Sequence, residues 1–240
     1  MNSESLFGYL TEPTLFSTAL PMTNAAAPLA KTRSGDPGRA KPRKPNRAEK
    51  AEATRARLFD AAVEIVGEYG YAGTSVARIT ERAEVAQGTF YNYFESRQDL
   101  LDQLLPAISE QLHQHIRLRV LAARGATERE RARLSAFFEF LEQAPHLFKI
   151  LSEGPVQAPE GFRRHLEQQT ESYRRAMRYE LQRGNLRISN PDELEVVTQM
   201  LLSAREYLSA RFCFVDGRFT RPPDFVVETY MKFVAATLFR

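Results

Sequence analysis

The sequence predicts an all-α fold in which a small three-helix, helix-turn-helix domain precedes a larger helical domain. Three observations support this. Apolar residues recur with a helical period from about residue 54 to the end. No convincing alternating strand appears. Glycines and prolines fall mainly between the periodic segments, where helices start or stop. With 240 residues and 43% hydrophobic content, the chain is long enough to bury a substantial core.

Composition restricts the setting. The single cysteine, Cys213, excludes an intrachain disulfide framework and a cysteine-rich metal site, which favours a reducing, cytoplasmic environment. No run approaches the roughly 18 uncharged apolar residues of a membrane span. The first 30 residues lack the basic and apolar regions of a secretory signal. We therefore expect a cytoplasmic protein without membrane contact.

Charge is concentrated before the predicted fold. Residues 31–57 carry ten basic and three acidic residues, a net charge of +7, whereas residues 1–30 and 58–240 each have a net charge of −2. Residues 1–50 also hold six of the thirteen prolines and show no helical period, which predicts a disordered arm. Two interpretations of its basic part, Arg39 to Lys50, remain open: a solvated tail, or an arm that contacts phosphates or a minor groove.

Residues 51–97 form the predicted helix-turn-helix domain. An amphipathic helix from about Thr54 ends at Gly70. Two short helices then follow in residues 71–95, with a tight turn between them. Thr74 is positioned to cap the first of these, and Ser96 to Asp99 has the spacing of a capping box that opens the next helix. Helices this short cannot bury a core of their own, but one of them can be presented to a DNA groove.

Residues 98–240 form the second predicted domain. A long helix from Ser96 to about Ala123 contains Pro106, which we expect to kink it near residues 103–105. A loop rich in glycine and proline is expected at residues 153–161. The other expected helices span about residues 127–143, 145–152, 159–183, 191–212 and 222–239.

The last two predicted helices are apolar on more than one side. In the final helix, Val226 and Tyr230 belong to one apolar stripe, and Val227 and Met231 belong to another. Such a helix must be buried on two sides. One large core would satisfy this, but a symmetric homodimer through paired helices is the simpler source of a second apolar partner.

The run from Thr54 to Leu101 resembles the DNA-binding domain of the TetR family of bacterial transcriptional regulators. The resemblance is carried by the segments RARLFDAAVE and YGYAGTSV, and above all by GTFYNYFESR at Gly88 to Arg97. It covers about a fifth of the chain. It implies that the protein is a DNA-binding regulator, most simply a repressor, that acts as a homodimer on a palindromic operator in double-stranded DNA. Such a protein would be cytoplasmic and nucleoid-associated, and no cofactor is implied.

Specific residues acquire roles from this resemblance. Val85 to Tyr93 would form the recognition helix and its approach, with Gln87 at a base edge and Gly88 allowing close approach of the backbone. Thr74 and Ser75 would bind phosphate. Phe90 and Phe94 would face the core. The implied DNA contacts are Thr74, Ser75, Gln87, Gly88, Thr89, Tyr91, Asn92, Tyr93 and Arg97.

Some features argue for simpler roles or depart from the family pattern. Tyr91 and Tyr93 could instead cover apolar surface. Glu84 stands where the family's turn often has glycine, and Ala86 stands where a capping serine is common. Residues 54–100 carry five basic and seven acidic residues, a weak electrostatic signature for a protein that binds DNA.

The resemblance also implies an effector pocket in the carboxy-terminal helices, where binding would change the separation of two recognition helices. Pro106 is either the flexible point of this change or simply lets its helix follow the core. Aromatic side chains suggest an apolar cavity for a fatty acyl or aromatic effector, although such residues are usually plain core. The candidate ligand contacts are Phe137, Phe148, Tyr173, Met177, Arg205, Tyr207 and Arg211.

Arg205 and Arg211 are unusual because they interrupt an otherwise apolar helix. They could bind an acidic head group, such as a carboxylate or a thioester-linked phosphate. Alternatively, they form salt bridges to Glu206 or across the dimer. The surrounding segment AREYLSARF is similar to stretches in family members linked to fatty-acid or acyl-CoA metabolism.

Enzymatic and metal-binding functions are disfavoured. His113 and His115 point about 200° apart on a helix, so they cannot share a metal ion. No glycine-rich phosphate loop or nucleophile with a nearby base is found. The main alternative is an architectural or division-related DNA-binding protein whose second domain binds a protein. A closed cavity would favour the ligand-responsive regulator, and an exposed apolar groove would favour the alternative.

The charge distribution predicts that the basic arm supplies part of the affinity for DNA. Deleting residues 1–50 should weaken operator binding and flatten its salt dependence, because counterion release scales with the number of phosphates neutralised. Fluorescence anisotropy over a series of salt concentrations measures both quantities. Equal affinity and an equal salt slope for the truncated protein would show that the arm takes no part in binding.

Overall fold

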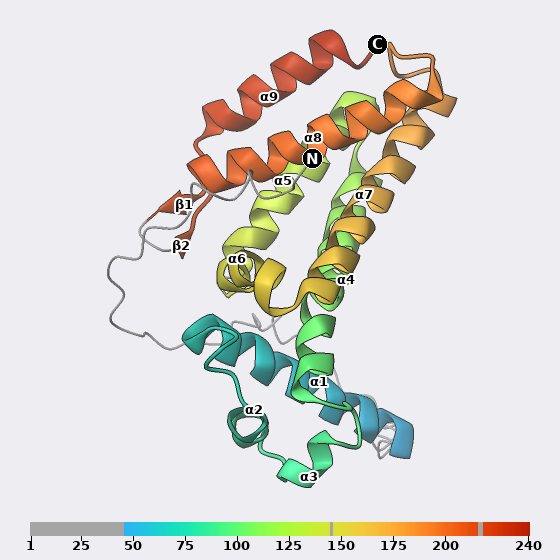
Figure 1. Ribbon diagram of the computed structural model, residues 1–240. Coiled ribbons are helices and arrows are strands. Elements are labelled where there is room, and N and C mark those ends of the chain that lie inside the picture. The colour runs from blue at the N-terminus through green and yellow to red at the C-terminus, as the bar shows by residue number, and fades with distance from the viewer. Residues whose placement is uncertain (1–45, 145, 216–217) are drawn as a thin grey trace, which may run out of the picture. The chain divides into compact units, whose positions relative to one another are not determined.

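The computed structural model describes residues 46–144, 146–215 and 218–240, and these form an all-α architecture as predicted (Figure 1). The sequence analysis did not anticipate the two-residue strands β1 and β2, which pair antiparallel after α8. The described elements are α1 (Arg47–Tyr69), α2 (Val76–Arg82), α3 (Gln87–Phe90), α4 (Arg97–Ala122), α5 (Ala126–Gln143), α6 (Leu147–Gln157), α7 (Pro159–Gln182), α8 (Pro191–Phe212), β1 (Phe214–Val215), β2 (Arg218–Phe219) and α9 (Asp224–Thr237).

The first helix begins earlier than expected. Asn46 caps α1 by accepting a hydrogen bond from the Glu49 backbone N–H (2.8 Å), and the Glu49 carboxylate accepts in return from the Asn46 backbone N–H (2.7 Å). Residues 47–50, which were assigned to a disordered arm, are therefore helical. The remainder of the predicted arm, residues 1–45, lies outside the described residues.

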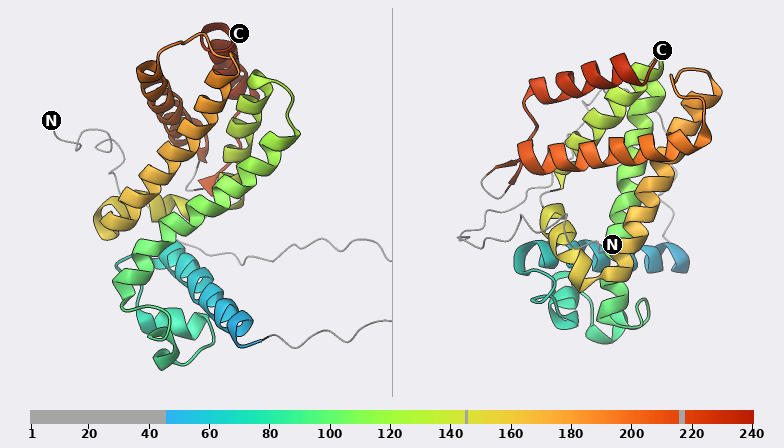
Figure 2. Two further views of the ribbon diagram at one scale, coloured as in Figure 1. Left: turned by 90° about the vertical axis from the view of Figure 1, so that its right-hand side faces the viewer. Right: turned by 45° about the horizontal axis from the view of Figure 1, so that its top comes forward.

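Helix α4 belongs to both parts of the fold. Its amino-terminal half packs against α1, and the helix also packs against α5, α6 and α7 (Figures 1 and 2). Ser96 caps it by accepting from the Asp99 backbone N–H (3.1 Å). The expected capping box is only half formed, because the Asp99 carboxylate accepts from the Glu95 backbone N–H (3.0 Å). The helix continues through Pro106.

Helix α6 is longer than the sequence suggested. The expected loop at residues 153–161 is mostly helical, with Pro155 inside α6 and a break at the buried residue Ala158. Packing explains the difference. A Cβ on Gly154 would lie 2.9 Å from Leu105, so α6 approaches α4 closely at this glycine. Local breaking tendencies are overridden by this contact.

Helices α8 and α9 each bury one face and expose another. Leu194, Leu201 and Leu202 of α8 are buried, as are Val226 and Met231 of α9. The exposed faces carry large apolar side chains, namely Val196, Met200 and Tyr207 on α8 and Phe225 and Phe233 on α9. None of the described helices is both long enough and apolar enough to cross a membrane.

A half-buried histidine joins α4 to α7. His165 Nδ1 lies 2.6 Å from Ser109 Oγ, which itself donates to the Leu105 carbonyl. The hydroxyl is thus free to accept from a neutral imidazole. Burial is the largest cause that lowers the pKa of His165, to about 4; Arg205 and His113 also lower it, and Glu206 opposes them. The fold therefore favours the uncharged ring.

This histidine should make stability pH-dependent. Because its pKa is lower in the folded than in the unfolded chain, the unfolded chain binds more protons between about pH 6.5 and pH 4. The free energy of unfolding should fall by about 2 kcal/mol between pH 7 and pH 5. Urea denaturation at several pH values measures this, and His165→Gln should reduce the loss. An identical pH dependence in the variant would contradict the assignment.

Candidate nucleic-acid interface and effector cavity

The amino end of α2 is held by Ser75, not by Thr74. Ser75 Oγ accepts from the Arg78 backbone N–H (3.3 Å), and Ser75 itself is exposed. Thr74 is 2% exposed, and its hydroxyl donates to the Gly70 carbonyl (2.8 Å). The expectation that the Thr74 hydroxyl caps the helix is therefore wrong, and this hydroxyl is turned away from any phosphate. Ser75 remains available for that role.

Glu84, which stands where the family's turn often has glycine, lies in the turn between α2 and α3 and has a glycine-like backbone conformation. Glu84 has a φ of 54°, the left-handed conformation that glycine adopts most easily. Ala86 precedes α3 without any side-chain cap. Phe90 and Phe94 are buried as expected, and the Phe94 ring contacts the Phe59 ring of α1 at 5.5 Å between centroids. These aromatic contacts fix α3 on the domain although it has only four helical residues.

The opposite face of α3 is open. Gln87, Gly88, Tyr91 and Asn92 are exposed, and Thr89 and Tyr93 are half-buried. A Cβ added to Gly88 would meet nothing within 4 Å. Six of the nine predicted DNA contacts therefore share one segment on the surface, at the bottom of the view in Figure 1.

Arg97 makes two contacts within the protein. Its Nε donates to the Thr74 carbonyl and its Nη2 donates to the Tyr71 carbonyl. These bonds tie the start of α4 to the loop before α2. Nη1 and the second N–H of Nη2 remain available for the predicted phosphate contact.

Other arginines of this domain are also engaged. Arg82 forms ion pairs with Glu64 (2.7 Å) and Glu68 (2.9 Å) of α1. Arg78 donates to the Gly73 carbonyl (2.7 Å), and Arg55 donates to Gln103 of α4 (2.8 Å). The two carboxylates offset the charge of Arg82, whereas Arg78 and Arg55, which donate to neutral acceptors, keep their charge but are held in place.

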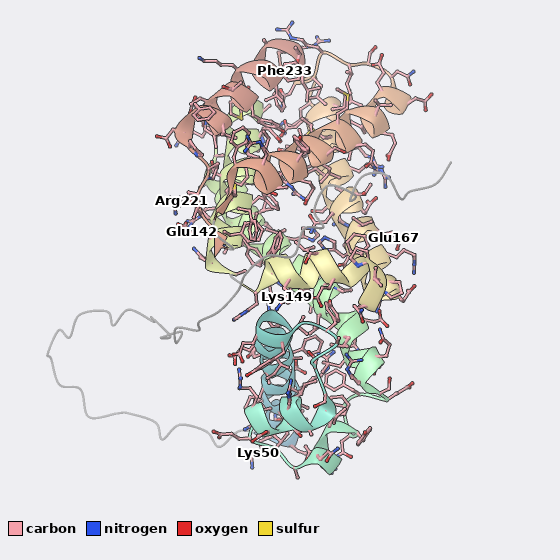
Figure 3. The ribbon with its side chains drawn as sticks, turned by 60° about the vertical axis from the view of Figure 1, so that its left-hand side comes forward. Lys50, Glu142, Lys149, Glu167, Arg221 and Phe233 are labelled. Atoms are coloured by element: carbon pink, nitrogen blue, oxygen red, sulfur yellow. The ribbon has the colours of Figure 1, made fainter. Side chains whose placement is uncertain are left out.

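A polar junction connects this domain to α6. The Tyr71 backbone N–H donates to the Glu153 carboxylate (2.8 Å), and the Tyr71 hydroxyl donates to the Ile150 carbonyl (3.4 Å). Lys149 extends from α6 toward α1, where its ammonium donates to the Glu68 carbonyl at 3.3 Å (Figure 3). Burial, with Glu153 as a smaller cause, raises the pKa of the Tyr71 phenol and keeps it a neutral donor.

The second domain contains a cavity of about 330 Å³ between α4, α5, α7 and α8. Its lining is mixed. Apolar atoms, among them those of Ile116, Val120 and Ala176, lie beside the charged side chains of Glu110, Arg117, Arg133, Arg175 and Arg205. Four of these five charged side chains are arginines, so the cavity is cationic as well as apolar, and most of the expected aromatic residues do not line it.

Two of the seven predicted ligand contacts line this cavity, Tyr173 and Arg205. Phe137 lies behind it, with its ring 4.1 Å from the Arg205 guanidinium carbon, and Met177 is core. The other three lie elsewhere. Phe148 stacks on Phe214 (3.8 Å), Tyr207 is 70% exposed, and the exposed Arg211 contacts the Phe212 ring. Arg205 does pair with Glu206 (2.8 Å), as one alternative proposed.

A buried carboxylate beside the cavity was missed by the sequence analysis. Glu130 of α5 has no exposed surface; it pairs with Arg133 and accepts hydrogen bonds from the hydroxyls of Tyr173 and Tyr230. Burial first, and Glu130 second, raise the pKa of Tyr173. In the sequence, this pair appears only as a glutamate followed three residues later by an arginine. Because such pairs are common on exposed helices, the pattern does not indicate burial.

Residues 58–104 match the family model described as "Bacterial regulatory proteins, tetR family". This region is thus a helix-turn-helix domain of the TetR type. The "Fatty acid metabolism regulator protein" of Bacillus subtilis is 44% identical over 48 residues, which cover 20% of this chain and 25% of the relative. The match thus spans only a quarter of the relative's length.

Solved structures extend the similarity to the fold of the second domain. A putative TetR-family regulator from Syntrophomonas wolfei has a TM-score of 0.63 and 22% identity, covering 76% of this chain and 93% of that protein. The transcriptional regulator FadR from Bacillus subtilis in complex with stearoyl-CoA has a TM-score of 0.54 and 20% identity, covering 64% of this chain and 84% of FadR.

The open surface above Gly88 predicts that a substitution there affects DNA binding without affecting stability. Gly88→Ala should leave the free energy of unfolding nearly unchanged and weaken DNA binding, because the added methyl group meets only the DNA. In Gly73→Ala the methyl group would lie 2.5 Å from the Tyr69 carbonyl, so this variant should lose about 1–3 kcal/mol of stability. Urea denaturation and fluorescence anisotropy measure the two effects. Unchanged DNA affinity in Gly88→Ala would count against α3 as the contacting helix.

Proposed function

We propose that the chain is a dimeric transcriptional repressor that binds a palindromic operator and is released when a small-molecule effector occupies the cavity. The exposed face of α3, within a domain that matches the TetR family model, carries the proposal. Gln87 lies at the start of α3, where its amide can contact the donor and acceptor pair of an adenine. Tyr91, Asn92 and Ser75 surround it as phosphate contacts. Such a protein acts at the nucleoid, in the cytoplasm.

A homodimer is supported by the exposed apolar faces of α8 and α9. Met200 is 57% exposed, Tyr207 is 70% exposed and Phe233 is 60% exposed. Figure 3 shows Phe233 on α9, far along the chain from the DNA-binding helices. Isolated exposed apolar residues are ordinary, but five on two consecutive helices favour a protein interface. A symmetric pair would place two copies of α3 on half-sites about 34–36 Å apart.

An effector role for the cavity is supported by its position and by the relatives. Helix α4 lines the cavity and also holds the helix-turn-helix, so a displacement at one end reaches the other. The relative of Bacillus subtilis is named as a regulator of fatty acid metabolism, and FadR is bound to stearoyl-CoA. The cavity favours a ligand-responsive regulator over an architectural DNA-binding protein, and these names support an effector with an acyl group.

Binding of the purified protein to DNA upstream of its own gene tests the proposal. We expect saturable, salt-sensitive binding in a fluorescence anisotropy assay and a dimer in analytical ultracentrifugation. Phe233→Glu should yield a monomer with at least about tenfold weaker operator binding, because each half-site then binds independently. Val156→Glu changes a side chain that is 80% exposed on α6 and should behave like the unaltered protein. Absence of DNA binding even at low salt would refute the proposed function.

A further inference from the structure

The inner wall of the cavity contains hydrogen-bond donors that have no partner. Arg205 is 3% exposed; its Nη2 donates to Gln169 Oε1 (3.1 Å) and Glu206 Oε1 (2.8 Å), but its Nε is buried and unpartnered within the described residues. Gln169 is 5% exposed and its Nε2 is likewise buried without a partner there. Leaving such groups unsatisfied costs free energy, which an acceptor in the cavity would recover.

A third buried polar atom lies on α4. His113 Nε2 has no hydrogen-bond partner within the described part of the chain. Burial is the largest cause that lowers the pKa of His113; the adjacent Gln169 side chain, close enough to interact with the ring, and Glu110 oppose it, and Arg205 and Arg175 lower it further. His113 is therefore neutral at physiological pH, and its ring can accommodate a donor or an acceptor, depending on the tautomer.

The charge of the cavity favours an anion. Four arginines and one glutamate line it. Arg133 and Arg205 are paired with Glu130 and Glu206, but no hydrogen bond or ion pair of Arg117 or Arg175 is found among the described residues. These last two side chains are exposed, so they give the approach to the cavity a positive potential.

We infer that the cavity binds a compact organic anion, whose acidic oxygens accept hydrogen bonds from Arg205 Nε and Gln169 Nε2. The carbon chain lies against Ile116, Val120 and Ala176. A volume of about 330 Å³ is at the lower end for ligand sites, so the enclosed part of the ligand is short. The acidic group is a carboxylate or a phosphate. This inference rests on the proposed function, because it names the chemical class of the effector.

The same cavity reaches α9 through one side chain. Arg133 lines the cavity and pairs with Glu130, which also accepts from the Tyr230 hydroxyl of α9 at 2.7 Å. An anion in the cavity competes with Glu130 for Arg133. Binding of an anion in the cavity therefore alters the contact between α5 and α9. The outer face of α9 belongs to the proposed dimer interface.

Isothermal titration calorimetry with four probes tests the inference on the full chain without DNA. Sodium octanoate, octanoyl-CoA and inorganic phosphate carry an acidic group, whereas 1-octanol has the same chain as octanoate without it. We expect at least one anionic probe to bind and 1-octanol to bind at least about tenfold more weakly than octanoate or octanoyl-CoA. Binding of octanoate assigns a carboxylate, and binding of phosphate or of octanoyl-CoA alone assigns a phosphate. Equal binding of 1-octanol, or binding of none of the anions, would overturn the inference.

Two arginines of α7 provide a matched pair of variants. Arg175 lines the cavity, and Arg178 is exposed three residues later outside it. Arg175→Glu should weaken binding of the anion several-fold more than Arg178→Glu, although both change the net charge equally. Arg205→Met, which removes the buried donor, should weaken it by about tenfold or more. If Arg205→Met does not fold, the exposed Arg175 and Arg178 pair still decides the outcome, and equal affinities in that pair would refute the site.

Failure of this inference and failure of the proposed function give different results. A protein that binds operator DNA and is released by 1-octanol, but not by any anion, would keep the proposed function and lose this inference. A protein that binds octanoate through Arg205 but binds no DNA would keep the anion site and lose the proposed function.

Discussion

The continuity of α4 is the constraint on which the rest of the structure depends. Leu100, Leu101 and Leu104 are fully buried against the helix-turn-helix and α1, and two turns later the same helix begins to line the cavity. A helix that belongs to two packed cores cannot shift at one end without repacking the other, because protein interiors are close-packed. The proposed DNA-contacting helix α3 and the cavity are thus connected through α4 before any particular ligand is considered.

Tyr71 makes the second connection between the two parts. Its backbone N–H and hydroxyl bind Glu153 and the Ile150 carbonyl of α6, while its own carbonyl accepts from Arg97 of α4. Tyr71, a buried residue, is therefore hydrogen-bonded to both α4 and α6. Arg97, which is also predicted to contact phosphate, thus ties the start of α4 to the loop before α2.

The sequence predicted the helices well and the cavity poorly, and the difference has a physical cause. Helices α4, α5, α7 and α8 follow from apolar periodicity and, for α4, from the Ser96 cap, which are local signals. The extent of α6 depends on Gly154 packing against Leu105, a contact that no local pattern records. Tyr173 and Arg205 were found as cavity residues, but Tyr207 and Arg211, on the same helix as Arg205, point to a different face.

The polar interior explains why aromatic composition was misleading. Phe137 and Met177 are buried as ordinary core, whereas Glu130, Arg133 and Arg205 are charged groups with less than a tenth of their surface exposed. Replacing a buried ion pair by apolar residues is often neutral or stabilising, so such pairs are weak contributors to stability. Stability therefore does not explain why Glu130 and Arg133 are buried. Their position between the cavity and Tyr230 suggests that they connect the cavity to α9. Helix periodicity identifies which residues are buried, but only the arrangement of their partners identifies which of them are free to bind something else.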